Sequence, residues 1–200
     1  GHTLEFEGQK YVLRSIPSGI FQGGKVNIIG NGVVLAPDLF MDEAKELEKS
    51  GHDLKSRLYI SKKAHLIMPT HRVLDRAYES LKGDHKVGTT GKGIGPTYTD
   101  KAARIGFKIQ DLYSFEALNE KIDMILPIKN KMLKNVYGLE EYTRDCILSL
   151  CEKYAELFKP YVCFDWQDLL NRYKDKKILF EGAQGVMLDV DYGTYPFVTS

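Results

Sequence analysis

The chain is organised around one glycine-rich stretch, Gly88-Thr89-Thr90-Gly91-Lys92-Gly93-Ile94-Gly95-Pro96. A helix interior is excluded, because each glycine there costs about 1 kcal/mol relative to alanine. The stretch also carries too little apolar surface to fill a core. Glycines allow backbone N–H groups to approach an anion closely, and hydroxyls beside them add further hydrogen bonds. We therefore interpret the segment as an anion-binding loop, with a plain glycine-rich connection as the alternative.

Two common nucleotide-binding motifs are excluded by their spacing. A P-loop requires a glycine, four residues and then Gly-Lys-Ser/Thr. Here Gly93 follows the Gly-Lys pair, and Lys86 stands where the first glycine is needed. A dinucleotide fingerprint requires a final glycine in the region that holds Pro96 and Tyr98. What remains is a hydroxyl-rich loop of another kind.

Several side chains near this loop or near the chain ends are candidates for chemistry. Thr90 can bind phosphate through its hydroxyl and its amide, and Arg104, on a short helix after the loop, can clamp phosphate with two hydrogen bonds. His2 lies outside any apolar pattern and can exchange protons near neutral pH. Gln184, between glycines, can contact a nucleobase edge or a phosphoryl oxygen. The remaining histidines are interpreted as surface or structural residues: His52, His65, His71 and His85.

Other polar and thiol side chains favour ordinary roles. Asp189 and Asp191 could bind a metal, but we favour a turn, since loop carboxylates two residues apart are common. An odd number of cysteines without metal-binding spacing argues against a disulfide framework and favours a reducing cytoplasm. Cys146 and Cys151 fall in a helical pattern and are interpreted as core residues.

Length and composition are those of a globular protein. The chain has 200 residues, with 43% hydrophobic and 28% charged residues, which suits one domain or a large part of one. The net charge of +1 provides no general attraction to nucleic acid, so an anion site must be local. No apolar run approaches the roughly 18 residues of a membrane-spanning helix. Because the first residue is Gly1 and the last, Ser200, follows no helix end, we expect a piece of a longer protein.

The first half alternates between strand and helix patterns. Strand patterns cover 25–29, 33–35, 58–61 and 65–68, and a hairpin with glycine in its turn joins 4–6 to 11–13. One helix pattern begins at Asp38, as the N-cap, and stops at Gly51, and another covers 71–82. The glycine-rich loop is placed at 83–99. This alternation predicts an α/β fold with a mostly parallel central sheet and flanking helices.

Residues 111–173 change to helical periodicity. Ser114 caps the first helix and Pro127 interrupts or kinks it, and further helices are predicted over about 139–158 and 165–173. We interpret 111–173 as a helical insertion with a packing role. A strand pattern returns at 176–180 and leads into the segment 181–185, a position at which open α/β sheets bind ligands.

Several long motifs, in order, resemble the adenylosuccinate synthetase family from end to end. These are Gly1-His2-Thr3-Leu4, Ile16-Pro17-Ser18-Gly19-Ile20, Ile29-Gly30-Asn31-Gly32-Val33-Val34, the stretch at 88–96, Phe180-Glu181-Gly182-Ala183-Gln184-Gly185 and the final segment 191–200. The resemblance implies a P-loop-NTPase-like fold truncated at both ends. Residues 1–200 would then form a single incomplete domain.

The resemblance also implies an activity. The family ligates IMP and L-aspartate to adenylosuccinate, with GTP as co-substrate and Mg²⁺ as cofactor, in the committed step of AMP synthesis. It implies a cytoplasmic homodimer in which Arg104 reaches the partner's IMP site, with no nucleic-acid or membrane partner.

Residue roles follow from the resemblance position by position. The implied catalytic residues are His2 and Gln184. The implied IMP contacts are His2, Thr90, Arg104, Gln184 and Thr199. The implied GTP contacts are Gly1, His2 and Thr3, and the carbonyl of Gly1 is the implied magnesium ligand. Lys92 stands where the family often has arginine, so it retains the charge without the bidentate fork.

The family's phosphate loop, which carries the catalytic aspartate base, would precede Gly1. The segments that recognise aspartate and guanine would follow Ser200. We therefore expect these 200 residues alone to be inactive. The alternative is a non-catalytic fragment that binds the IMP phosphate or forms a dimer.

Overall fold

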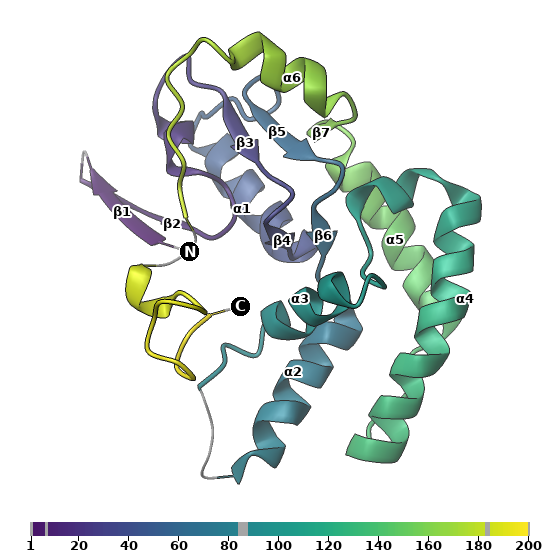
Figure 1. The fold of residues 1–200 in the computed structure, drawn as a ribbon. Coiled ribbons are helices and arrows are strands. Elements are labelled where there is room, and N and C mark those ends of the chain that lie inside the picture. The colour runs from purple at the N-terminus through teal and green to yellow at the C-terminus, as the bar shows by residue number, and fades with distance from the viewer. Residues whose placement is uncertain (1, 7, 84–87, 183–184, 200) are drawn as a thin grey trace.

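The computed structural model of the chain describes residues 2–6, 8–83, 88–182 and 185–199. Small sheets occupy the first half and the region near residue 162, and helices pack around them (Figure 1). The predicted α/β class with a mostly parallel sheet is confirmed.

The centre of the fold is a parallel sheet with the strand order β3-β5-β7. Its members are β3 (Asn27–Ile29), β5 (Leu58–Ser61) and β7 (Val162–Cys163). A second parallel pair joins β4 (Val34–Leu35) to β6 (His65–Leu66). A short turn separates β3 from β4, and another separates β5 from β6. The β4–β6 pair therefore continues the β3–β5 pair after an interruption. The predicted strand at 58–61 is confirmed with its bounds, and those predicted at 25–29, 33–35 and 65–68 are present but shorter.

The predicted hairpin is confirmed. Strand β1 (His2–Phe6) pairs antiparallel with β2 (Gln9–Leu13), and Gly8 in the turn has a φ of 73°. A positive φ is strained for residues with a Cβ, which explains the glycine at this turn.

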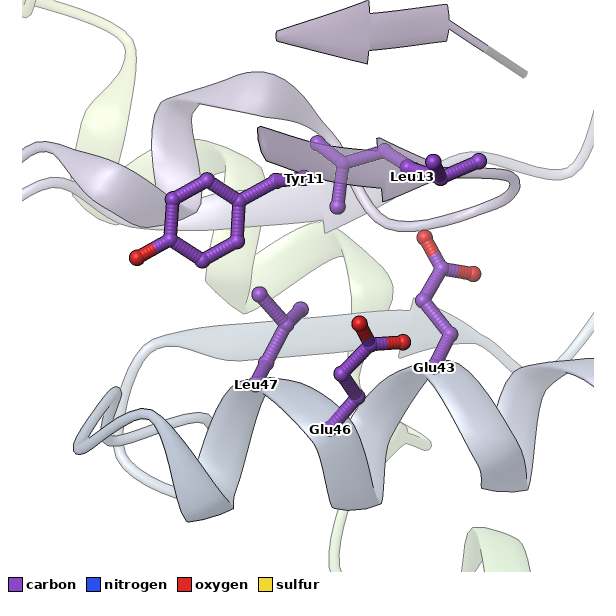
Figure 2. A pocket seen from close by; sticks show the side chains of 6 residues that line it. Tyr11, Leu13, Glu43, Glu46 and Leu47 are labelled. Carbon is purple, nitrogen blue, oxygen red and sulfur yellow. The ribbon is translucent and has the colours of Figure 1, made fainter. Parts of the chain in front are cut away.

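Glu43 ties the end of this hairpin to helix α1. Its buried carboxylate accepts hydrogen bonds from the amides of Arg14 at 2.7 Å, Ser15 at 3.0 Å and Ile16 at 3.1 Å. Figure 2 shows Glu43 rising from the helix towards the strand that carries Leu13. The hollow beside it has a volume of about 10 Å³, no more than one water molecule needs, so it is not a ligand pocket.

Helix α1 (Pro37–Lys49) begins one residue earlier than predicted. Its N-cap is Ala36, and Asp38 lies inside the first turn, where Arg72 of α2 (Pro69–Leu81) binds it with two hydrogen bonds. The N-cap prediction was therefore wrong. Burial acts to raise the pKa of Asp38, but the hydrogen bonds and charge of Arg72 outweigh it and lower that pKa.

The glycine-rich loop ends sooner than predicted, because α3 (Ile94–Ala102) begins within the 83–99 segment. Helix α4 (Phe115–Lys131) starts at the predicted cap, and the Ser114 hydroxyl accepts a hydrogen bond from the amide of Ala117. Pro127 does not interrupt the helix, which runs through it into a π-helical turn at Met132–Val136.

The remaining helices are α5 (Arg144–Phe158) and α6 (Trp166–Tyr173). Helix α5 begins five residues later than predicted, because its N-cap is Thr143. Cys151 is buried as predicted, but Cys146 is exposed, because the buried face of α5 is formed by Ile147, Cys151, Tyr154 and Phe158. The strand β7 also lies inside the segment predicted as a purely helical insertion. Short 3₁₀ turns cover Ser18–Phe21, Ile109–Tyr113 and Val186–Leu188.

One core cluster joins these elements. Phe40 of α1 is fully buried between Phe158 of α5, with ring centroids 5.3 Å apart, and Tyr161, at 5.4 Å. The aromatic contacts connect the first helix of the chain to a helix more than a hundred residues later. The helical segment is therefore packed on the sheet domain as part of the same core.

The strand predicted at 176–180 is not formed. A strand exists only where its backbone groups pair with a neighbour, and none of the described strands pairs with this segment. Its apolar side chains are exposed, with 56% of Ile178, 88% of Leu179 and 90% of Phe180 accessible to solvent. Figure 1 shows residues 185–199, in yellow, as coil with one short helical turn at Val186–Leu188, away from the central sheet.

Candidate functional site

Two acidic residues of α2 hold the glycine-rich loop at both ends. The buried carboxylate of Asp75 accepts a hydrogen bond from the amide of Gly93 at 2.8 Å. The carboxylate of Glu79 accepts from the amides of Gly88 at 2.6 Å and Thr89 at 3.4 Å. These amides are therefore not available to an external anion, which corrects the expectation that the whole loop presents bare N–H groups.

The middle of the loop remains open. Among the described residues, no acceptor is recorded for the amides of Thr90, Gly91 and Lys92. The side chains of Thr90 and Lys92 are exposed. Three successive amides without a recorded acceptor, beside one hydroxyl and one ammonium group, are an arrangement that can bind an anion. The anion-binding interpretation is thus narrowed from nine residues to three.

Gly93 fixes where the loop meets α2. Its φ is 83°, and a Cβ there would lie 2.9 Å from the amide nitrogen of Arg72 and 3.0 Å from the carbonyl carbon of His71. Only glycine allows this approach. The loop therefore lies directly against the first turns of α2.

A buried polar network connects α2, α3 and α4. His71 Nε2 lies 2.9 Å from Asp100 Oδ2, and Lys129 Nζ lies 2.6 Å from Asp100 Oδ1. The Thr97 hydroxyl donates to the Gly93 carbonyl at 2.6 Å and lies 3.0 Å from His71 Nδ1. Burial acts to raise the pKa of Asp100, but the hydrogen bonds from His71 and Lys129 outweigh it and lower that pKa.

The hydrogen bonds determine the tautomer of His71. The backbone amide of Met68 can only donate, and it donates to Nδ1 at 2.9 Å. Nδ1 is therefore unprotonated, and the ring proton sits on Nε2, where it is donated to Asp100. His71 is a neutral link between the start of α2 and the middle of α3, which is the structural role predicted for it.

The sequence predicted that Arg104 lies on a short helix. In the structure α3 ends at Ala102, and Arg104 follows it. Its φ is 66°, and the turn around it is closed by the Asp100 carbonyl, which accepts hydrogen bonds from the amides of Ile105 at 2.9 Å and Gly106 at 3.1 Å. The Arg104 side chain is exposed. Among the described residues no hydrogen bond holds its guanidinium, so it is available to a ligand or a second subunit.

His65 packs beneath this turn. A Cβ on Gly106 would lie 2.6 Å from the imidazole Cδ2, so the close approach requires glycine. Burial, reinforced by the charges of Lys101, Lys108 and Lys121, lowers the pKa of His65 to about 4. His65 is therefore neutral at physiological pH and is a structural residue, as predicted.

The other predicted site residues lie elsewhere. His2 begins β1 opposite Leu13, and its side chain lies outside the described part; Thr3 beside it is exposed. Thr199 is half-buried, and its amide donates to the Leu188 carbonyl at 2.9 Å. Gly1 and Gln184 lie outside the described residues. No recorded contact joins Thr90, Arg104 and Thr199 within the described part of the chain.

One contact connects the end of the chain to its beginning. The carboxylate of Glu181 accepts hydrogen bonds from the amide of Ser18 at 3.0 Å and from its hydroxyl at 2.6 Å. Both residues belong to motifs noted in the sequence. Nearby, the Asp189 carboxylate accepts from the amides of Asp191 and Tyr192, each at 2.9 Å, so it caps a turn.

A second, larger hollow lies away from these residues. A cavity of about 400 Å³ between α1 and α5 is lined by Asp38, Met41, Leu150, Lys153, Tyr154 and Leu157. Among the described residues, no group of three or more His, Cys, Asp or Glu side chains is placed to hold a metal ion. Nor does any helix in that part combine the length and apolar character needed to cross a membrane.

A family model described as adenylosuccinate synthetase matches residues 1–200. The chain belongs to the adenylosuccinate synthetase family.

Individual adenylosuccinate synthetases show how much of a relative this chain covers. The protein of that name from Bacteroides thetaiotaomicron is 59% identical over all of this chain and 47% of the relative. Its namesake from Chlorobaculum tepidum is 51% identical over all of this chain and 46% of the relative. A solved structure of fully ligated adenylosuccinate synthetase from Plasmodium falciparum is 34% identical, with a TM-score of 0.84, and is matched over 46% of its length. The chain spans about half the length of these relatives.

In this member of the adenylosuccinate synthetase family, sequence reasoning missed the residues that hold the loop. Asp75 and Glu79 follow His71 at intervals of four on one helix. Polar residues at that spacing beside the buried Leu74 are a signal for a polar helix face turned inward.

Proposed function

We propose that the protein containing this chain ligates IMP and L-aspartate to adenylosuccinate, forming GDP and phosphate, in the committed step of AMP synthesis. In the first step the γ-phosphoryl group of GTP is transferred to the 6-oxygen of IMP, and GDP leaves. In the second the aspartate amine attacks carbon 6, and inorganic phosphate leaves. Such phosphoryl transfer requires positioned groups and charge neutralisation more than covalent chemistry.

The observation that carries this proposal is the open centre of the glycine-rich loop. The amides of Thr90, Gly91 and Lys92 have no recorded acceptor among the described residues, while their neighbours on both sides are held by α2. A 5′-phosphate of IMP supplies the anion for these amides, and the Thr90 hydroxyl adds one hydrogen bond. Lys92 contributes a point charge at the rim.

The residues that would contact the reacting end of IMP are assigned by family resemblance. His2 would hydrogen-bond the 6-oxygen and donate to the transferred phosphoryl group, and Gln184 would hold the same oxygen. Gly1, His2 and Thr3 would contact the GTP phosphates. Magnesium, when bound, would neutralise phosphate charge. Gly1, its proposed ligand, lies outside the described residues, so the magnesium proposal rests on the family alone.

Arg104 supports a homodimer as part of the proposal. Its exposed side chain, on a turn fixed by Asp100, can reach a phosphate in a neighbouring subunit. Thr199 would add a further contact to the IMP phosphate. We also propose a cytoplasmic location, since all three cysteines are free, and a single incomplete domain for residues 1–200.

The phosphate assignment is tested in the full-length protein with Thr90→Ala and Arg104→Ala. Each should raise the KM for IMP by about 10-fold or more, because a hydrogen bond to a charged group contributes roughly 1.5–3 kcal/mol. The KM for GTP should change little. Thr99→Ala is the control, since the exposed Thr99 hydroxyl only bonds the Gly95 carbonyl on its own helix. Unchanged IMP constants in both variants would refute the assignment.

The role of His2 is tested separately with His2→Asn. Loss of an acid group should lower kcat by about 100-fold or more, with the KM values for both nucleotides changed only a few-fold. Equal losses in turnover and in nucleotide affinity would contradict an acid role.

A non-catalytic fragment is the second candidate, because the same open amides would bind the IMP phosphate without any chemistry. A coupled assay on the isolated 200 residues separates the two. We expect no adenylosuccinate from them and measurable product from the full-length protein. Product from the isolated chain would overturn the first expectation, and none from the full-length protein would favour the second candidate.

A further inference from the structure

The buried network of His71, Asp100 and Lys129 does more than the packing of α2, α3 and α4 requires. The three side chains are 1%, 4% and 9% exposed. A buried ion pair is weak evidence for stability, because apolar residues of similar volume often serve as well. A fully hydrogen-bonded polar network does, however, specify one relative placement of the elements that carry it.

That placement concerns α3 above all. Gly93, Thr97 and Asp100 lie along one face of the helix at intervals of four and three residues. Asp75 of α2 accepts a hydrogen bond from the Gly93 amide, and Thr97 Oγ1 lies 3.0 Å from His71 Nδ1. The Asp100 carboxylate accepts from His71 and Lys129. The helix is therefore located at its start, its middle and its end by groups that permit only one register.

Both ends of α3 lead directly to the proposed phosphate contacts. The open amides of Thr90 to Lys92 immediately precede Gly93. At the other end, the carbonyl of Asp100 closes the turn that carries Arg104. A shift of α3 along α2 would move both phosphate contacts together.

We propose that His71 and Asp100 are positioning residues for the 5′-phosphate of a purine nucleoside monophosphate. They hold α3 in the register that places Thr90 and Arg104 for binding, and they do not touch the ligand themselves. The inference rests on the proposed function and adds residues to its phosphate site.

A matched pair of substitutions in the full-length protein tests the link. His71→Gln keeps a donor at the place of Nε2 for Asp100 but loses the acceptor for the Met68 amide. His71→Asn keeps that acceptor but loses the donor to Asp100. Each variant loses one hydrogen bond, so similar reductions in Tm are expected. The KM for IMP should rise about 10-fold in His71→Asn and less than 3-fold in His71→Gln, with the KM for GTP unchanged in both. Equal effects on the KM for IMP, or none, would overturn the proposal.

Thr97→Val provides a second test with a variant that retains shape. It removes the hydroxyl that donates to the Gly93 carbonyl and lies beside His71 Nδ1, and we expect the KM for IMP to rise about 5-fold with little change in Tm. An unchanged KM would count against positioning. Ile147→Ala, in the buried face of α5, serves as the control for instability: it should lower Tm at least as much and leave the KM for IMP unchanged.

Thr90→Ala, measured in parallel, separates the two proposals. If Thr90→Ala raises the KM for IMP and the network variants do not, only the positioning role is wrong. If none of these variants affects the KM for IMP, the phosphate assignment itself fails and the positioning role fails with it.

Discussion

The segment 34–74 and the segment 174–199 carry similar apolar patterns, but only the first is packed. In the first, Leu35, Phe40 and Ile60 are completely buried. In the second, Leu179, Phe180 and Tyr192 are each more than 85% exposed. The difference lies in the partners available. In the first segment β4 pairs with β6, and β5 pairs with β3 and β7, whereas no described strand pairs with 176–180.

The recorded contacts of the C-terminal segment are hydrogen bonds of polar groups. The Glu181 carboxylate binds Ser18, and the amide of Thr199 binds the carbonyl of Leu188. Fully burying a large apolar side chain stabilises a fold by about 1.5–3 kcal/mol, and this segment gains almost none of that. Exposed apolar patches of this kind commonly mark a surface that contacts another protein segment or another molecule. The first segment therefore buries its apolar side chains among the described residues, and the C-terminal segment leaves most of its own exposed.

The largest effect is expected in the packed core. Phe40→Ala removes a fully buried ring between Phe158 and Tyr161. The free energy of unfolding should fall by about 3–5 kcal/mol. Urea denaturation of the 200-residue chain, followed by circular dichroism, measures it. A loss below about 1 kcal/mol would show that the core is not the stabilising centre described here.

Substitution by alanine should reduce the stability of the fold by different amounts at the two glycines that lie at opposite ends of the loop. Gly88 and Gly93 have φ values of 80° and 83°, but a Cβ meets open space at Gly88 and the α2 backbone at Gly93. Gly88→Ala should cost about 1–2 kcal/mol from the left-handed backbone alone. Gly93→Ala should cost about 1–3 kcal/mol more, because the helix must shift. Equal losses in thermal unfolding would contradict the packing of the loop on α2.

The packed region should also show an acid-sensitive step. The pKa of His65 is about 4 in the folded chain against 6.5 ordinarily, so the unfolded chain binds the proton first as pH falls. Stability is therefore complete above pH 6.5 and is lost progressively between pH 6.5 and about 4. His65→Leu should flatten that slope, by an amount on the order of 2 kcal/mol across the range. An unchanged slope in the variant would mean that other groups produce it.

Much of the packed region was predictable because its signals are local. The strands at 58–61 and the cap at Ser114 follow from alternation and capping chemistry within a few residues. The N-cap at Asp38 was mispredicted because Arg72, far along the chain, draws its carboxylate away. The strand at 176–180 was mispredicted because a strand needs a partner, and the pattern alone cannot supply one.

The glycines beside Thr90 predict an anion loop from sequence alone, and that assignment stays a prediction. The detail of the loop could not be predicted. Which amides remain open depends on Asp75 and Glu79, two side chains of another element that accept the rest. The side chains of His71 and Lys129 meet at Asp100 only because three helices pack together. Such convergence depends on tertiary structure that a residue pattern does not contain.

The smallest effect on stability is expected for a substitution in the C-terminal segment of the 200-residue chain. The same substitution should have a larger effect in the longer protein. Leu179 is 88% exposed, so Leu179→Asp in the 200-residue chain should change the free energy of unfolding by less than about 0.5 kcal/mol. If the apolar run is covered in the full-length protein, the same substitution there places a charge in an apolar contact and should lower Tm by several degrees. Asp191→Asn, at another exposed position of the segment, should leave both proteins unchanged. If Leu179→Asp leaves the Tm of the full-length protein unchanged, the apolar run is exposed there as well. The contrast between the two regions would then come from their sequences, and no further segment would cover the run.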